Sequence, residues 1–158
     1  RELYKKGLTG EELGAIITDM ETEDPFSVNG VLDTAAWANT GTTGPTVGES
    51  LVRAGHKLRR ADKNRIQGKI QVHEYLKVRE NGRPKLQIFN TCPNLIRELQ
   101  SIPLSKTNPE DVDTKASDHA YDALRYMIMS RPRMESPLER IRGLKREMYR
   151  PVDSTFGY

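Results

Sequence analysis

Three aspartates have the residue type and spacing that metal-dependent chemistry requires. Asp118 and Asp122 are four residues apart in a predicted helix, so their side chains share one face of it. Asp33 ends the short apolar segment 28–32 and opens a polar loop, a position from which an α/β strand can deliver a carboxylate to a cleft. Carboxylate oxygens are the ligands that Mg²⁺ and Mn²⁺ prefer. The three aspartates are therefore candidate metal ligands.

Each of these aspartates also has an ordinary structural alternative. Asp33 precedes Thr-Ala-Ala-Trp and can cap a short helix. Asp118 can stabilise its own helix through the helix dipole, and Asp122 can pair with Arg125 or with solvent. Like charges four residues apart destabilise a helix slightly, and a bound divalent cation would offset that cost.

Further candidate outer metal ligands are His119, which directly follows Asp118, and three residues of an acidic loop: Glu110, Asp111 and Asp113. The alternative for the loop is a solvated run of charges, and the alternative for His119 is an exposed surface position.

Basic residues gather in the middle of the chain. Residues 1–50 carry 3 basic and 9 acidic side chains, whereas residues 51–100 carry 12 basic and 4 acidic ones. Such a stretch can bind the phosphate backbone of DNA without reading its sequence, and the alternative is an ordinary solvated surface. The candidate DNA-binding residues are Arg59, Arg60, Lys63 and Arg65.

Helices must alternate with short strands to bring these residues together. Thr9 and Glu12 form a capping-box pattern that predicts a helix start, and Asn-Gly at 81–82 predicts a β-hairpin over 77–89. The expected strands are residues 28–32 and 57–59, and the expected helices are 9–20, 34–38, 47–54, 64–76, 92–100 and 117–130. This alternation indicates an α/β class. The face of the last helix expected to pack inward comprises Ala116, Ala120, Ala123 or Leu124, and Met127.

Length and composition exclude several classes of protein. A chain of 158 residues, 35% of them hydrophobic, is long enough for one domain with a modest core. No run of 18 apolar residues predicts a transmembrane helix, and the single Cys92, expected to be a packing residue, excludes a disulfide scaffold. No glycine-rich loop followed by Lys-Ser or Lys-Thr indicates a P-loop ATPase site.

The chain divides into a domain over residues 1–130 and a basic C-terminal tail over 131–158. Prolines stand at 132, 137 and 151 in the tail, and a short basic helix is expected over 138–148. Because the first residue is Arg1 rather than methionine, we expect the chain to be a fragment, a processed product or part of a larger protein.

Four stretches, in this order, resemble the C-terminal nuclease domain of phage terminase large subunits. They are Arg-Glu-Leu-Tyr at 1–4 with Leu-Thr-Gly-Glu-Glu-Leu at 8–13, Gly-Val-Leu-Asp at 30–33, Asn-Arg-Ile-Gln-Gly at 64–68 running to His-Glu-Tyr-Leu at 73–76, and Ile-Phe-Asn-Thr-Cys-Pro-Asn-Leu-Ile at 88–96 followed by 111–126. The last stretch, with Asp-Val-Asp before Asp-His-Ala-Tyr-Asp-Ala-Leu-Arg-Tyr, is the most specific. The resemblance spans roughly residues 1–130.

The resemblance implies a ribonuclease-H-like mixed sheet flanked by helices, incomplete at its N-terminus. It also implies a two-metal endonuclease that uses Mg²⁺ or Mn²⁺ to cut concatemeric double-stranded DNA. The second acidic position of the family matches Asp33 and the third matches Asp118, the expected catalytic pair. His119 stands where many members have another aspartate, and Asp122 ranks below Asp118.

The family's first acidic position would lie upstream of residue 1, and its ATPase domain is not in this sequence. We therefore expect the chain alone to be a weak or inactive nuclease. The implied partners are double-stranded DNA, the phage portal protein and the small terminase subunit, with no membrane. The implied location is the host cytoplasm during capsid packaging. The alternatives are another ribonuclease-H-like nuclease, such as a junction resolvase, and a non-catalytic DNA-binding or assembly module.

Overall fold

The computed structural model describes residues 1–39, 41, 44–106, 108, 110–113 and 117–131. Within these ranges the chain forms a mixed α/β structure of five α-helices, one 3₁₀ helix and a two-stranded parallel sheet. The elements are α1 (Gly10–Glu21), β1 (Asn29–Leu32), η1 (Thr34–Trp37), α2 (Val47–Arg53), β2 (Lys57–Arg60), α3 (Arg65–Leu76), α4 (Pro93–Ser101) and α5 (His119–Ser130).

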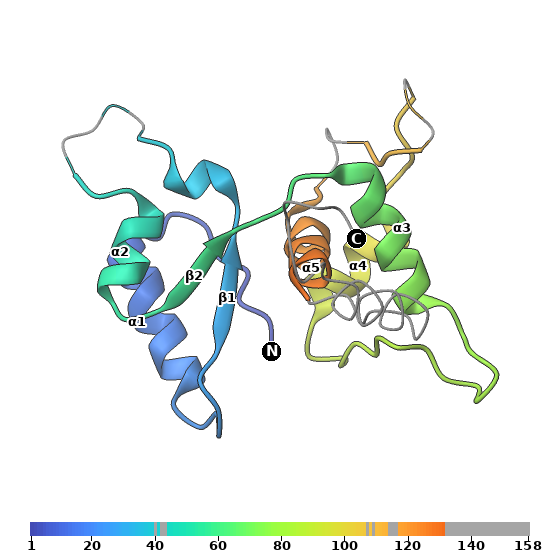
Figure 1. The fold of residues 1–158 in the computed structure, drawn as a ribbon, viewed down its shortest axis with the longest axis horizontal. Helices are drawn as coiled ribbons and strands as arrows, with labels where there is room; N and C mark the ends of the chain where they lie inside the picture. Colours follow the sequence, from blue (N-terminus) through green and yellow to red (C-terminus); the bar gives the residue numbers. More distant parts are fainter. Residues whose placement is uncertain (40, 42–43, 107, 109, 114–116, 132–158) are drawn as a thin grey trace, which may run out of the picture.

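The N-terminal half is a β-α-β unit with α1 packed against α2 (Figure 1). The strands β1 and β2 pair in parallel, from Asn29 opposite Lys57 to Leu32 opposite Arg60. Parallel neighbours need a long crossover, and here η1 and α2 supply it. Capping boxes start both helices, with Thr9 as the N-cap of α1 and a matching threonine before α2.

The C-terminal half packs α3, α4 and α5 around a single apolar cluster. Its fully buried members are Val72, Val112, Tyr121, Leu124 and Ile128. The closest approach lies between α3 and α5, where a Cβ at Gly68 would come within 2.5 Å of the buried Arg125 side chain. Glycine is favoured there because any larger side chain would force the Arg125 side chain or the two helices to shift.

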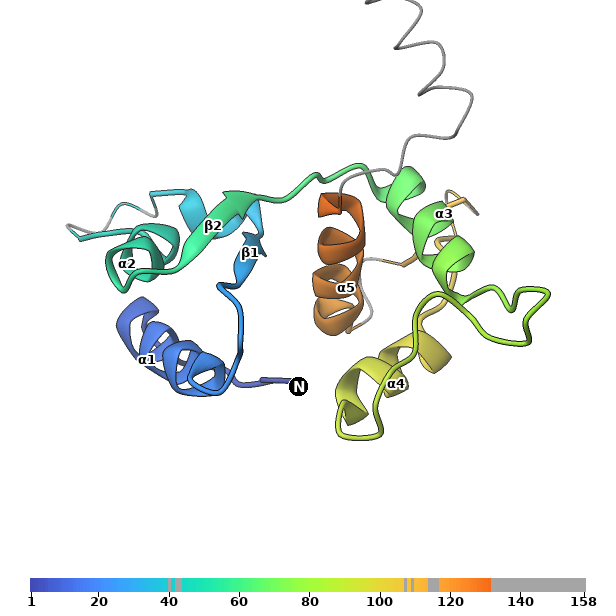
Figure 2. The same ribbon diagram turned by 60° about the horizontal axis from the view of Figure 1, so that its bottom comes forward.

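A single extended segment after β2 joins the two halves. The amide of Ala61 donates to the carbonyl of Leu32 at 2.9 Å, so the end of β1 stays tied to this segment. The helix α5 then lies between the sheet on one side and α3 with α4 on the other (Figures 1 and 2). This arrangement places the C-terminal end of β1 next to α5.

The mixed α/β class is confirmed, and the described part of the chain holds a sheet of two parallel strands. The predicted hairpin over 77–89 is wrong. A turn does form, with Gly82 at φ +74° and its amide bonded to the carbonyl of Arg79. The segment after the turn does not return as a strand, because the amide of Leu86 donates to the carbonyl of Tyr75 at the end of α3 and its side chain packs against the apolar cluster.

The inward face predicted for α5 is wrong in part. Leu124 is buried as expected, but the buried side of the helix runs through Tyr121, Arg125 and Ile128. Ala120, Ala123 and Met127 instead line an open cavity of about 740 Å³ shared with residues 1–7. The larger side chains face α3 and α4 because they fill that interface, which alanines cannot do.

The predicted tail helix over 138–148 lies outside the described residues. Among the helices that are described, none is both long and apolar enough to cross a membrane.

Candidate functional site

The aspartate at the end of β1 and Asp122 of α5 meet at one tyrosine. The Tyr126 hydroxyl donates to Asp33 Oδ2 at 2.6 Å and lies 3.4 Å from Asp122 Oδ2. Because both carboxylates contact this one oxygen, their nearest oxygens are at most about 6 Å apart. The fold therefore brings together two acidic residues that are far apart in the sequence.

Asp33 has two roles in the structure. Its Oδ1 accepts the Ala35 amide at 2.7 Å, so it caps η1, the structural alternative raised for this residue. The same oxygen lies 3.1 Å from Lys63 Nζ. Partial burial raises the pKa of the Asp33 carboxyl, but the bonds from Ala35, Tyr126 and Lys63 outweigh it and lower the pKa to about 2. The carboxylate is thus held ionised.

Asp122 is surrounded by guanidinium groups. Arg125 donates to Asp122 Oδ1 from Nε at 3.1 Å and from Nη2 at 3.0 Å, which is the pairing alternative raised for this aspartate. Arg65 Nη1 lies 3.8 Å from Asp122 Oδ2, and Arg65 Nε donates to Asp111 Oδ2 at 2.9 Å. Partial burial lowers the pKa of Arg65. The neighbouring carboxylates of Asp111, Asp122 and Asp118 raise this pKa by more, so it is raised overall and the guanidinium stays charged.

Asp118 occupies the N-cap position of α5, yet its side chain makes no capping hydrogen bond. Its carboxyl is half-buried one helical turn before Asp122. Burial raises the pKa of Asp118 first, and the neighbouring Asp122 charge raises it further, against the opposing effect of Arg65 and His119. A carboxyl in this setting gains from any additional positive charge that comes close to it.

The predicted outer ligands lie differently from the three aspartates. The side chain of His119 is 72% exposed, with Nδ1 3.9 Å from Asp118 Oδ1. In the acidic loop, Asp111 reaches the site through its bond to Arg65, while the backbone amide of Asp113 bonds to the carbonyl of Pro103. Asp111 was predicted as an outer ligand together with Glu110 and Asp113, and the structure instead pairs it with Arg65.

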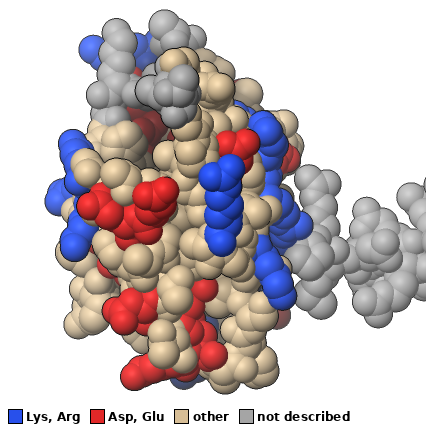
Figure 3. All heavy atoms as spheres, turned by 90° about the vertical axis from the view of Figure 1, so that its left-hand side faces the viewer, with Lys and Arg blue, Asp and Glu red and all other residues tan. Residues whose placement is uncertain are grey.

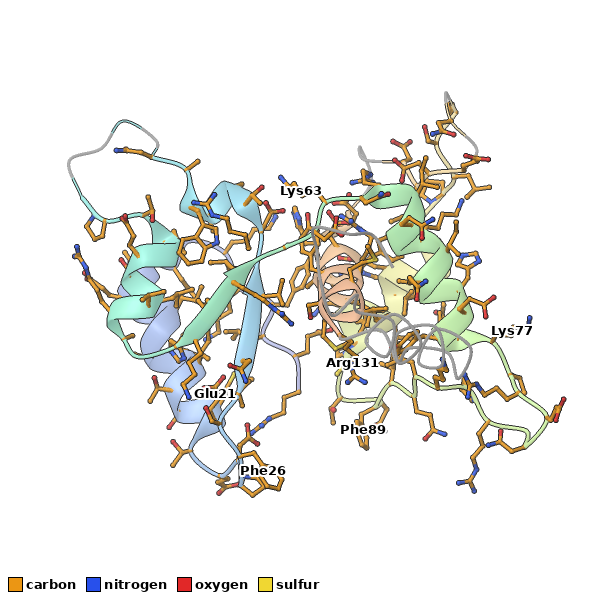
Figure 4. All side chains as sticks on the ribbon, viewed as in Figure 1. Glu21, Phe26, Lys63, Lys77, Phe89 and Arg131 are labelled. Atoms are coloured by element: carbon orange, nitrogen blue, oxygen red, sulfur yellow. The ribbon has the colours of Figure 1, made fainter. Side chains whose placement is uncertain are left out.

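The four predicted DNA-binding residues divide into two groups. Arg65 is half-buried and ion-paired inside the site. The other three form an exposed run that we call the basic strip: Arg59, Arg60 and Lys63. Within it Arg59 donates to the carbonyl of Ser130, Arg60 lies 5.4 Å over the Trp37 ring, and Lys63 points out at the junction of the two halves (Figure 4).

The opposite side of the N-terminal half has a different charge pattern. Seen from the left-hand side of Figure 1, acidic side chains gather over the middle and lower part of that face, with basic ones mainly toward its edges (Figure 3). Such a mixed face offers DNA less attraction than a continuous basic surface. The basic strip is therefore the better candidate for phosphate contact.

Sequence reasoning missed Tyr126, and it named Arg125 as an alternative partner of Asp122 without predicting that Arg125 is buried. Tyr126 lies four residues after Asp122 and eight after Asp118, so helical spacing alone puts it on the same face. Arg125 is only 2% exposed and also stacks on the Tyr126 ring at 4.5 Å. Its burial has no sequence signal, because a charged side chain on a helix is usually exposed.

The donor chemistry of the site fits a hard divalent cation. Asp33, Asp118 and Asp122 offer carboxylate oxygens, and none of them competes with a soft sulfur ligand. In the described part of the chain, however, no group of three or more histidine, cysteine, aspartate or glutamate side chains is arranged to hold a metal ion. Lys63 and Arg125 now neutralise Asp33 and Asp122. The three aspartates could therefore supply some, but not all, of the ligands of a bound divalent cation.

Comparisons of the chain with protein-family models, with curated proteins and with solved structures give no match.

Proposed function

We propose that this chain is the nuclease part of a phage terminase large subunit, a metal-dependent endonuclease with a ribonuclease-H-like fold. The observation that supports it most is the convergence of Asp33 from β1 with Asp122 from α5 on the hydroxyl of Tyr126. Asp118 lies one turn away on the same helix. The sequence resemblance expects acidic residues at Asp33 and Asp118, and it ranks Asp122 below Asp118.

In this proposal Asp33 and Asp118 are the principal ligands of Mg²⁺ or Mn²⁺, with Asp122 in support. Bound divalent ions would activate water and stabilise the leaving oxygen of a phosphodiester. The protein's own contribution is to hold Asp33 ionised and to hold Asp33 and Asp122 in place. Tyr126 fixes Asp33 against α5, and Arg125 fixes Asp122 on the opposite side.

DNA would approach along the basic strip. Lys63 contacts Asp33 at 3.1 Å, so phosphates bound by this lysine would lie next to the acidic residues. The contacts would be to the backbone, which suits an enzyme that cuts without reading bases. The proposed substrate is concatemeric double-stranded DNA. The proposed partners are the portal protein and the small terminase subunit, in the host cytoplasm.

Plasmid nicking tests this proposal. We expect the chain to nick supercoiled DNA slowly in Mn²⁺ and not in EDTA, because the family's first acidic position is missing from it, and we expect Asp118→Ala to lower that slow rate at least tenfold. Asp19→Ala is the matched control, because Asp19 is an exposed aspartate on α1 in the other half of the molecule. Equal loss of activity in both variants would contradict the proposed role of Asp118.

The second candidate function is a non-catalytic DNA-binding or assembly module. It is favoured by the pairing of Asp33 with Lys63 and of Asp122 with Arg125, since paired carboxylates need no metal. DNA binding that persists in EDTA, without cleavage in Mn²⁺, would support this module over the nuclease.

A further inference from the structure

The α5 helix is capped by a residue from another helix. Glu98, on α4, is 1% exposed, and its Oε2 accepts the amides of Ala120 at 2.7 Å and Tyr121 at 2.9 Å. These amides belong to the first turn of α5, where backbone donors have no partner within the helix. A carboxylate at this point also matches the positive end of the helix dipole.

The buried charge of Glu98 is fully supported by its surroundings. Its Oε1 accepts the Tyr4 hydroxyl at 3.1 Å and the Ser117 hydroxyl at 3.3 Å. A buried carboxylate without such donors would be strongly destabilising. Four donors from two segments, the N-terminal residues and residues 117–121, therefore hold this side chain in one place, and with it the start of α5.

An aspartate at the position of Asp118 would ordinarily cap the first turn of α5 itself. Aspartate is among the preferred N-cap residues because its side chain can accept an amide from the first helical turn. Here Asp118 stands at the N-cap position, but its carboxylate makes no capping bond. Glu98 already occupies the amides that an N-cap side chain would use. The Asp118 carboxylate is consequently available on the Asp122 side of the helix.

We propose that Glu98 is a positioning residue, which caps α5 in place of Asp118 and so leaves the Asp118 carboxylate free to serve the site. The part that concerns metal rests on the proposed function above. The capping exchange itself does not, because it depends only on hydrogen bonds at the start of α5. The two parts can therefore fail separately.

A double-mutant cycle measured by urea unfolding of the full chain tests the exchange. In the wild-type background we expect Asp118→Ala to change the unfolding equilibrium constant by less than about twofold, since no cap is lost. With Glu98→Ala present, Asp118 takes over the capping, and the same change should cost about fivefold, the usual effect of an N-cap side chain. Thr46→Ala, which removes the N-cap of α2, should cost about fivefold in both backgrounds.

If Glu98→Ala does not fold, the comparison of Asp118→Ala with Thr46→Ala in the wild-type background still tests the proposal. An Asp118→Ala effect as large as that of Thr46→Ala would show that Asp118 is a cap, and it would overturn the proposal. An additive cycle, with no coupling between Glu98 and Asp118, would overturn it as well.

Mn²⁺ titration followed by electron paramagnetic resonance separates positioning from a merely structural role. Glu98→Ala should weaken Mn²⁺ binding about fivefold, because the metal must compete with the new capping bond of Asp118. Glu98→Gln should restore most of the affinity, since its amide oxygen can still accept the two amides. Unchanged affinity in Glu98→Ala would overturn the positioning role. If the double-mutant cycle shows coupling between Glu98 and Asp118 but the chain binds no Mn²⁺, the capping exchange is supported and the metal site is refuted.

Discussion

Removal of one hydroxyl group, in Tyr126→Phe, tests the link between β1 and α5. The ring is buried and would keep its packing, so the variant removes little except the 2.6 Å bond to Asp33 and the longer 3.4 Å contact with Asp122. Burial first, and then the bond to Asp33, raises the pKa of Tyr126. The phenol therefore stays protonated and remains a donor at every pH used below.

The size of the effect follows from the pKa of Asp33. The difference between its ordinary value of 3.8 and about 2 in the fold corresponds to about 2 kcal/mol of stability. Tyr126 supplies one of three hydrogen bonds that lower this pKa, and the Asp33 side chain is 37% exposed, so solvent screening reduces the contribution. We expect Tyr126→Phe to lower the free energy of unfolding by about 0.5–1 kcal/mol at pH 7.

The sign of the pH dependence is fixed by the direction of the pKa change. A carboxyl whose pKa is lowered by folding contributes stability that is complete above pH 3.8 and is lost as the pH falls through about 2. The difference between wild type and Tyr126→Phe should therefore be constant from pH 7 to pH 5 and should shrink below pH 3.8. In the variant, the pKa of Asp33 should rise toward its ordinary value.

Urea unfolding in EDTA at several pH values, together with carboxyl ¹³C titration of Asp33, measures both quantities. Tyr75→Phe, on α3, is the matched control for loss of a tyrosine hydroxyl outside the site. A Tyr126→Phe variant with an unchanged Asp33 pKa would refute the reasoning, as would a stability loss that is the same at pH 7 and pH 2.

Two further predictions concern packing and DNA binding. Gly68→Ala should destabilise the fold by about 1 kcal/mol in urea unfolding, because overpacking against the buried Arg125 side chain outweighs the gain in helix propensity, whereas Gly44→Ala, with no atom within 4 Å of the added Cβ, should be near neutral. Replacing all three residues of the basic strip by alanine should lower the slope of log K against log salt for duplex binding by about 2–3, at roughly 0.9 per lost phosphate contact. An unchanged slope would exclude the strip as the DNA contact.

Local signals in the sequence predicted most of the helices. The capping box at Thr9, the N-cap at Asn64 and the proline in the first turn of α4 each stand where a helix starts in the structure. These signals work because the groups that satisfy the first helical turn are close in sequence. The same locality explains the failure at 77–89, where the turn residues were correct but a distant packing contact decided the path of the chain.

The candidate site was predictable in its acidic residues, but only in part in their partners. Asp33, Asp118 and Asp122 carried a visible pattern, and the structure brings Asp33 and Asp122 to one hydroxyl. The pairing of Asp33 with Tyr126 crosses 93 residues, and no periodicity connects positions so far apart. Helical spacing does suggest the pairing of Asp122 with Arg125 three residues later, but the pairing of Asp33 with Tyr126 depends on how the two halves meet.

Capping between helices is the clearest case of such a long-range dependence. Neither α4 nor α5 has a side-chain cap at its own N-cap residue. Glu2 accepts the amide of Leu95 at 2.8 Å and so caps α4, while Glu98 of α4 caps α5. The N-terminal segment thus holds α4, and α4 holds the helix that carries the acidic residues. Because each link is a carboxylate on a helix N-terminus, a change at Glu2 would reach Asp118 through two helices, without any contact between the two residues.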